Sequence, residues 1–213
     1  MASISTIAPV ILAAGDSTRM GYPKALLPLG TDTFITRILH ILHKTGLPAP
    51  TIILGRSAPI VGPLISEWAA DLRINPDPDR GQLSSIQLAL SCIRPEFDAG
   101  MIWPVDQPAV SEKLVRELAH LFIAAGSMIT CPVYRGRRGH PAIFHRGLFR
   151  EFMEAPLEEG PKKILLRHEQ DTAMLPTDEC AVVRDIDTPS DYEELTGETI
   201  HSALARRGIL LGV

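Results

Sequence analysis

Residues 7–24 read IAPVILAAGDSTRMGYPK, an apolar run followed by a loop of small and cationic residues. The run 7–12 predicts a buried β-strand. Small side chains in the loop let the backbone approach a phosphate closely, and Arg19 and Lys24 can neutralise its charge, although isolated cations are more often solvated surface residues. The stretch predicts a nucleotide-binding loop at the end of a first strand, and it matches neither G-x-G-x-x-G nor the P-loop pattern.

Composition limits the classes of protein that this chain can represent. Its 213 residues suit one domain, and 45% apolar with 22% charged residues support a core. A net charge of −4 argues against a general nucleic-acid binder. Three scattered cysteines without a C-x-x-C pair argue against a structural zinc site and favour a reducing, cytoplasmic location. Neither a signal peptide nor a membrane span is expected, since no cation precedes the first apolar patch and no apolar run approaches ~20 residues.

Strand-like and helix-like segments alternate along the chain. The expected strands are 7–12, 51–54, 72–74, 100–105, 128–133, 142–144 and an edge strand at 181–184. The expected helices include one capped near Thr33 and ended by Gly46, one over 60–70, one capped by Ser84 or Ser85, and one from Ser111 to about Ala124. This rhythm predicts a single-domain α/β fold, with a mostly parallel sheet and helices on both faces. We expect one domain over 1–198 and a helical tail over 199–213 that packs on it.

Carboxylates follow two of the later segments. Asp106 comes directly after the expected strand 100–105, where it is a natural Mg²⁺ ligand or, alternatively, a simple turn residue. Asp185, Asp187 and Asp191 lie in the stretch DIDTPSD. Asp191 is expected in the first turn of a helix, where negative charge is favourable. Asp187 is the preferred second metal ligand because it lies at the junction before that helix.

Two polar turns complete the candidate site. Residues 81–85 have the sequence GQLSS. Their polar groups could recognise the edge of a base, although a simple helix cap is the plainer interpretation. Residues 136–141 read GRRGHP and could hold an anionic acceptor. The sequence indicates no serine or cysteine partner for the histidine, which argues against a hydrolytic triad.

These motifs occur together in an order that resembles a known family. The opening loop, G-Q-x-x-S, D-Q-P, G-x-x-G-H-P and D-I-D-T-P-x-D resemble the molybdenum cofactor nucleotidyltransferases, and specifically the cytidylyltransferase branch. The resemblance runs from residue 7 to about 195. It implies a Rossmann-like nucleotidyltransferase fold of the MobA-like NTP transferase superfamily. It also implies Mg²⁺-dependent transfer of CMP from CTP to the terminal phosphate of molybdopterin, with release of pyrophosphate.

The resemblance also implies roles for individual residues. The implied nucleotide-binding residues are Leu12, Ala13, Ala14, Gly15, Arg19, Lys24, Gly81, Gln82, Ser84 and Ser85. The implied catalytic residues are Arg19, Lys24 and Asp106, the Mg²⁺ ligands are Asp106 and Asp187, and the acceptor-binding residues are Gly139, His140 and Pro141. The guanylyl branch typically opens with L-A-G-G, so Ala14 favours CTP over GTP. Val105 departs from the small residue that is usual before the metal aspartate.

Other functions remain open on the sequence alone. The opening loop is shared with sugar- and alditol-phosphate nucleotidyltransferases, so an enzyme of that class is one alternative. An NTP transferase that uses GTP is another. The family also includes nicotine-blue-type oxidoreductases, for which no dinucleotide fingerprint is present. A non-catalytic carrier of the finished cofactor is a fourth reading. The expected partners are CTP, molybdopterin or the molybdenum cofactor, and a molybdenum hydroxylase that receives the product, with no nucleic acid and no membrane.

Overall fold

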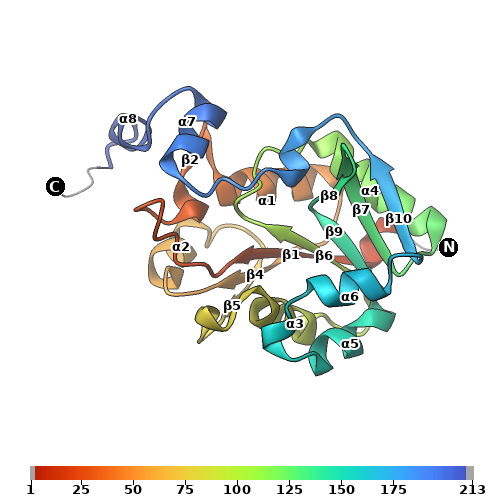
Figure 1. Cartoon of the computed structure of the whole chain (residues 1–213). Helices are drawn as coiled ribbons and strands as arrows, with labels where there is room; N and C mark the ends of the chain where they lie inside the picture. Colours follow the sequence, from red (N-terminus) through yellow and green to blue (C-terminus); the bar gives the residue numbers. More distant parts are fainter. Residues whose placement is uncertain (1–2, 210–213) are drawn as a thin grey trace.

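One β-sheet runs through the middle of the molecule (Figure 1). The structure is a computed structural model that describes residues 3–209. Its strands are β1 (Ile7–Ala13), β2 (Pro28–Leu29), β3 (Asp32–Thr33), β4 (Thr51–Leu54), β5 (Asp71–Ile74), β6 (Ala99–Pro104), β7 (Ile129–Tyr134), β8 (Arg137–Arg138), β9 (Ala142–His145) and β10 (Thr172–Pro176). The main sheet has the order β10-β7-β9-β6-β1-β4-β5, with β8 paired to β7, while β2 and β3 pair separately.

The neighbours of β1 explain the parallel character of the sheet. β1 pairs in parallel with β4 and β6, and β4 pairs in parallel with β5. β7 and β10 are also parallel, whereas β9 is antiparallel to both β6 and β7. All seven residues of β1 are buried, which is the pattern of a strand covered on both faces. The expected single-domain α/β fold with a mostly parallel sheet is confirmed.

Helices cover both faces of the sheet. They are α1 (Phe34–Thr45), α2 (Ala58–Leu64), α3 (Gln82–Cys92), α4 (Glu112–Ala125), α5 (Phe149–Glu154), α6 (Lys162–Arg167), α7 (Pro189–Thr196) and α8 (Ile200–Arg206). One buried apolar cluster joins the sheet to α1, α2, α4, α7 and α8. A second cluster joins the other face to α3, α5 and α6. Figure 1 shows α1 and α4 on one side of the sheet and α3, α5 and α6 on the other.

Local signals set several helix ends as the sequence predicts. Thr33 caps α1 in a capping box with Thr36, and Gly46 ends the helix in the left-handed conformation. The Ser111 hydroxyl accepts a hydrogen bond from the Leu114 amide and so caps α4. Within residues 3–209, no helix is both long enough and apolar enough to span a membrane.

Three expected elements differ in the structure. Residues 180–183 form a short 3₁₀ helix rather than an edge strand, and β10 occupies the sheet edge beside β7 instead. α3 begins at Gln82 after Gly81, whose φ is +90°, and neither Ser84 nor Ser85 caps it. α2 ends at Leu64 instead of residue 70, because Gly62 and Pro63 weaken a helix interior.

The C-terminal tail is helical where it is described. α8 buries Ile200, Ala203 and Leu204, and Arg207 donates a hydrogen bond to the Gly30 carbonyl oxygen at 2.9 Å. These contacts place the tail against the β2–β3 hairpin and α7. Residues 210–213 of the expected tail lie outside the described residues, and a domain boundary at residue 198 stays a prediction.

Candidate active site

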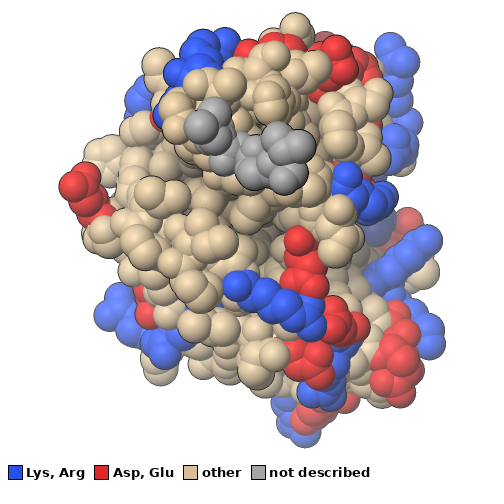
Figure 2. Space-filling view, turned by 90° about the vertical axis from the view of Figure 1, so that its left-hand side faces the viewer, with Lys and Arg blue, Asp and Glu red and all other residues tan. Residues whose placement is uncertain are grey.

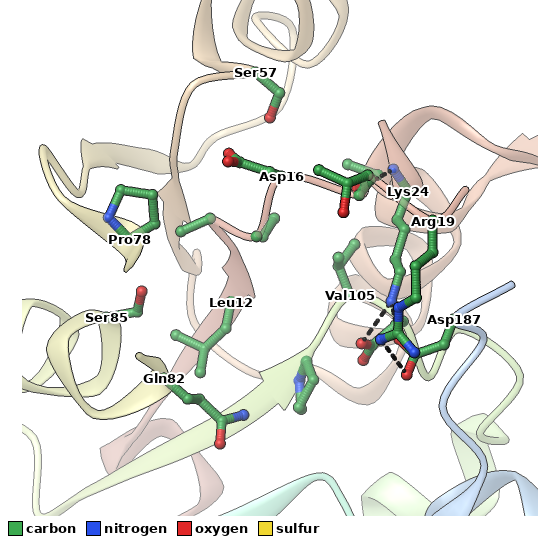
Figure 3. A pocket seen from close by; sticks show the side chains of 18 of the residues that line it. Leu12, Asp16, Arg19, Lys24, Ser57, Pro78, Gln82, Ser85, Val105 and Asp187 are labelled. Carbon is green, nitrogen blue, oxygen red and sulfur yellow. Dashed lines mark hydrogen bonds and ion pairs between the residues drawn. The ribbon is translucent and has the colours of Figure 1, made fainter. Parts of the chain in front are cut away.

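A cavity of about 380 Å³ opens where β1 and β6 end and α3 begins. This is the edge of a parallel sheet at which ligands bind. The cavity is lined by Leu12, Ala13, Ala14, Gly15, Asp16, Ser17, Thr18, Arg19, Lys24, Ala25, Ser57, Pro78, Gly81, Gln82, Ser85, Pro104, Val105, Asp106 and Asp187. Figure 3 shows Arg19, Lys24 and Asp187 together on one side, with Gln82, Ser85 and Pro78 on the other. The tertiary structure therefore gathers most of the candidate residues around one cavity.

Contacts with Gly55 and Ser17 fix the shape of the loop after β1. A Cβ built on Gly55 would overlap the carbonyl oxygen of Ala14, so only glycine fits beside the loop there. Ser17 has a φ of +53°, and its hydroxyl accepts a hydrogen bond from the Lys24 amide at 3.0 Å. Sequence reasoning missed both residues. The Gly directly after the strand 51–54 was the available signal for Gly55, whereas Ser17 offered none beyond lying in the loop.

Lys24 sits between the two predicted metal carboxylates. Its ammonium donates to Asp106 Oδ2 at 3.2 Å and also to Asp187 Oδ1. Arg19 donates from Nη2 to Asp187 Oδ2 at 2.9 Å. The Lys24 side chain is only 13% exposed, while that of Arg19 is 68% exposed. Lys24 is thus a charge inside the site, whereas Arg19 is an exposed cation at the rim of the cavity.

The two carboxylates differ in their electrostatic surroundings. Burial raises the pKa of Asp106, and the nearby charges of Asp185 and Asp187 add to this effect, whereas Lys24 opposes it. The hydrogen bond with Lys24 lowers the pKa of Asp187, the charges of Lys24 and Arg19 lower it further, and burial opposes them without reversing the direction. Asp187 is therefore the firmly ionised member of the pair, and Asp106 is the one that a further positive charge would stabilise.

The residues present fit a divalent metal held together with phosphates. Asp106 Oδ1 is buried and has no hydrogen-bond partner among the described residues. Two carboxylates share one cation here, and within residues 3–209 no group of three or more His, Cys, Asp or Glu side chains is arranged so that it could hold a metal ion by itself. Mg²⁺ commonly takes one or two carboxylates and completes its shell with phosphate oxygens and water. The donor set suits such a metal and does not suit an all-protein cage.

The D-Q-P and D-I-D-T-P segments are joined beside the cavity. Gln107 donates from Nε2 to Asp185 Oδ1 at 2.6 Å, and the Ile186 amide donates to the Asp106 carbonyl oxygen at 2.9 Å. Trp103 donates its indole N–H to the Gln107 carbonyl oxygen at 3.0 Å. These bonds hold Asp106 and Asp187 at a set separation, which explains how residues about eighty positions apart meet.

The predicted acceptor residues lie outside the lining of the cavity, next to Asp185. The His140 amide donates to the Val182 carbonyl oxygen at 2.8 Å, and a Cβ on Gly139 would overlap the same oxygen. Burial lowers the pKa of His140, and the charge of Asp185 opposes this effect. Pro141 follows directly and leads into β9. The turn 139–141 therefore packs on the 3₁₀ helix of residues 180–183, and its role toward an acceptor stays a prediction.

The start of α3 is organised by Asn75, a residue that no sequence motif singled out. The buried Asn75 amide nitrogen donates to the hydroxyls of Ser84 and Ser85, both at 2.9 Å. Ser85 lines the cavity, together with Gln82 and Gly81. Ser84 is not among the lining residues, since its hydroxyl donates back to the Gly81 carbonyl oxygen at 2.8 Å.

An ion-pair triad borders the mouth of the cavity. Arg56, which follows β4, pairs with Asp16 of the loop and with Asp79, where the distance to Oδ1 is 3.2 Å. These contacts lower the pKa of Asp79. The triad connects three chain segments around the opening. Arg56 gave no motif signal in the sequence.

Fold and site together define an α/β protein with a cavity at the carboxyl edge of its sheet, where two cationic side chains lie beside two carboxylates. The family model described as the MobA-like NTP transferase domain matches residues 9–174. The chain therefore belongs to the MobA-like NTP transferase family, and it is an NTP transferase of that type.

Individual relatives agree with this family. A probable molybdenum cofactor guanylyltransferase of Mycobacterium tuberculosis is 27% identical over 177 residues, which cover 74% of this chain and 77% of that protein. The bifunctional protein GlmU of Mycolicibacterium paratuberculosis is 38% identical over 74 residues, which are 34% of this chain and only 15% of that protein. This chain thus matches a small part of GlmU.

A solved structure extends the comparison to nearly the whole chain. The crystal structure of Rv0371c from Mycobacterium tuberculosis H37Rv aligns with a TM-score of 0.80 at 28% identity, and covers 92% of this chain and 100% of that one. Its complex with manganese aligns with a TM-score of 0.75 at 28% identity, over 91% and 99% of the two chains.

Proposed function

We propose that this protein transfers CMP from CTP to the terminal phosphate of molybdopterin or the molybdenum cofactor, with release of pyrophosphate. The observation that carries the choice of CTP is Ala14. Its side chain lines the cavity and belongs to the same buried apolar cluster as Leu12 and Leu83 at the start of α3. A methyl group at this lining position takes up room in the cavity, and a one-ring base needs less room than guanine.

The chemistry needs charge stabilisation more than proton transfer. An oxygen of the acceptor phosphate attacks the α-phosphorus of CTP, a new P–O bond forms, and the bond to the β-phosphate oxygen breaks with its electron pair going to pyrophosphate. The acceptor is already an anion, so no strong base is required. This agrees with a cavity lined by cations and carboxylates, without a paired nucleophile and base among its lining residues. Arg19 and Lys24 would neutralise the phosphates, the positions where negative charge develops.

Asp106 and Asp187 would hold the divalent metal, which when bound supplies positive charge to the phosphate oxygens. The unpartnered Asp106 Oδ1 and the raised pKa of Asp106 support this assignment, because both indicate a carboxylate that lacks a full positive counterpart. The manganese complex of Rv0371c supports a divalent metal in a relative of this chain. In this protein the metal is proposed to be Mg²⁺.

The test of the nucleotide is a comparison of pyrophosphate release with CTP, GTP, UTP and ATP in the presence of molybdopterin and Mg²⁺. We expect kcat/KM to be highest for CTP. Ala14→Gly should raise the GTP to CTP ratio of kcat/KM by about tenfold or more, since one methyl group in a pocket changes discrimination by roughly that factor. Ala8→Gly, the matched loss of a methyl group from the same apolar cluster but outside the cavity lining, should leave the ratio near that of the wild type. A wild type that prefers GTP contradicts the proposal.

The test of the metal assignment is Asp106→Asn. This variant should lose the metal-dependent rise in thermal stability that CTP gives the wild type, because a neutral amide replaces the charged carboxylate. Asp178→Asn removes an exposed carboxylate that does not line the cavity and should behave as the wild type. Equal metal-dependent stabilisation in Asp106→Asn and wild type would remove Asp106 from the metal site.

GTP is the second candidate nucleotide, because the relatives that cover most of the chain are named guanylyltransferases. The same assay decides between the two. Two added measurements, with a sugar phosphate as acceptor and with NADPH as ligand, separate the remaining alternatives. A carrier binds the cofactor without releasing pyrophosphate, a sugar-phosphate enzyme releases pyrophosphate with the sugar phosphate, and an oxidoreductase binds NADPH. We also propose that a molybdenum hydroxylase receives the product.

A further inference from the structure

β5 is the last strand of the main sheet, and no strand of residues 3–209 pairs with its outer edge. Its inner edge faces β4: the Asp71 amide donates to the Pro50 carbonyl oxygen, and the Asn75 amide donates to the Leu54 carbonyl oxygen. Backbone groups alternate in direction along a strand of a parallel pair. The amides and carbonyls of Leu72 and Ile74 consequently point outward, where they are free to pair with another strand.

An apolar patch lies beside this edge. Leu72 and Ile74 are 38% and 63% exposed, and on α2 the side chains of Ile60 and Leu64 are 57% and 64% exposed. The two elements adjoin each other, since a Cβ on Gly62 of α2 would lie 3.8 Å from Leu72 Cδ1. Figure 2 looks onto the side of the molecule where α2 lies, and a broad part of this face carries neither acidic nor basic side chains.

The opposite face of β5 carries one charge of each sign. Asp71 and Arg73 alternate with the apolar pair, and Arg73 donates from Nε and Nη2 to Asp71 Oδ2 at 3.0 and 2.9 Å. Natural edge strands are commonly protected by short length, like charges, proline or a bulge. β5 has four residues and contains no lysine, proline or bulge, and its two charges have opposite signs, which makes the edge complementary to itself.

We propose that a second copy of this chain pairs with β5 in antiparallel orientation, about a two-fold axis that passes between the Leu72 residues of the two copies. In this register Leu72 exchanges backbone hydrogen bonds with the partner's Leu72. Asp71 lies opposite the partner's Arg73, and Arg73 lies opposite the partner's Asp71, at the non-hydrogen-bonded positions where side chains approach most closely. The two sheets become one continuous sheet with a closed, symmetric contact.

Charge and a proline favour this register over registers with the two-fold axis at Arg73 or Ile74. An axis at Arg73 would set the two Arg73 side chains against each other, and like charges directly opposite are unfavourable. An axis at Ile74 would bring Pro76, which has no amide hydrogen, into the ladder. With the axis at Leu72, the apolar face of both strands lies on the α2 side. The exposed Ile60 and Leu64 of each copy then cover those of the other.

The proposal is tested by charge reversal on the full chain, with mass measured by sedimentation equilibrium over a range of concentrations. The wild type should approach twice the mass of one chain as concentration rises. Asp71→Arg alone and Arg73→Asp alone should each weaken association by about tenfold or more, because each turns two attractive pairs into repulsive ones. The control variant Arg150→Asp makes an equal change of charge at an exposed position of α5, and it should associate as the wild type does.

Two further samples make the result specific to this register. An equimolar mixture of the Asp71→Arg and Arg73→Asp variants should form a heterodimer, since arginines on one strand then face aspartates on the other. The double variant with both changes should return to wild-type association, which also shows that the exchanged residues fold normally. A wild type that stays monomeric at every concentration overturns the proposal, and so does a dimer that the single variants leave unchanged or that the mixture does not restore.

Discussion

At the scale of single residues, the site depends on one ammonium group between two carboxylates. Lys24 contacts both Asp106 and Asp187, and its backbone is held by Ser17. This arrangement explains why Arg19 and Lys24 differ in burial although both belong to one loop motif. Lys24 neutralises the interior of the site before any ligand binds, while Arg19 can extend toward a ligand from the rim.

Lys24→Ala should lower kcat for pyrophosphate release by about 10² or more if the ammonium meets charge that develops on the phosphates. The measurement is steady-state kinetics with saturating CTP and Mg²⁺. Lys113→Ala removes an ammonium that is 82% exposed on α4 and should leave kcat unchanged. An unaltered kcat in Lys24→Ala would place this residue outside the reaction.

At the scale of elements, the loop after β1 rests on the turn after β4. Gly55→Ala should destabilise the protein and weaken nucleotide binding together, since its Cβ would overlap backbone that cannot move without displacing Ala14. We expect a loss of about 1–3 kcal/mol in the free energy of unfolding, measured by chemical denaturation. Gly15→Ala is the matched control for stability: nothing lies within 4 Å of a Cβ at this position, so this variant should unfold with nearly the free energy of the wild type. Equal stability of the two variants would refute this account of Gly55.

Helices α5 and α6 are linked by Glu151, which pairs with Arg167 Nε and His168 Nε2, both at 2.6 Å. Burial raises the pKa of Glu151, but the hydrogen bonds from His168 and Arg167 outweigh it, and the pKa lies below its ordinary 4.5. A lowered folded-state pKa stabilises the native state above the unfolded-state pKa, and this stabilisation is lost as the pH falls through the folded value.

Glu151→Gln should therefore be less stable than the wild type at neutral pH, and the difference should shrink as the pH falls below about 4.5. Urea denaturation of both proteins across this range measures it. Glu158→Gln, at an exposed position nearby, should show no such pH dependence. A difference that grows in acid would contradict the assigned direction.

At the scale of the whole molecule, two apolar clusters pack on the two faces of the sheet and so fix the carboxyl ends of its strands. The tail contributes to one of them through Ile200, Ala203 and Leu204. Leu204 is fully buried, so Leu204→Ala should cost about 2–5 kcal/mol of unfolding free energy, measured by denaturation monitored by circular dichroism. Ile209→Ala, at an exposed position farther along the same tail, should cost much less. A negligible cost for Leu204→Ala would mean that the tail is dispensable to the domain.

The sequence predicted the architecture well because its strongest signals are local. A continuous apolar run such as β1 is buried on both faces, and capping residues such as Thr33 and Ser111 set helix ends by bonds within one turn. The edge strand was the main error. Residues 180–183 are as apolar as a strand, but the edge position beside β7 is filled by β10, and that competition is decided by tertiary pairing.

The sequence by itself determined the fold class and the residues that carry charge at the ends of the strands. Only the tertiary structure decided that Asp106 and Asp187 share Lys24, that Asn75 aligns Ser84 and Ser85, and that Gly55 must be glycine. The physical reason is the range of the interactions. Helix caps and strand patterns act over a few residues, whereas a hydrogen bond or a backbone contact between residues far apart in the chain exists only once the sheet has brought them together.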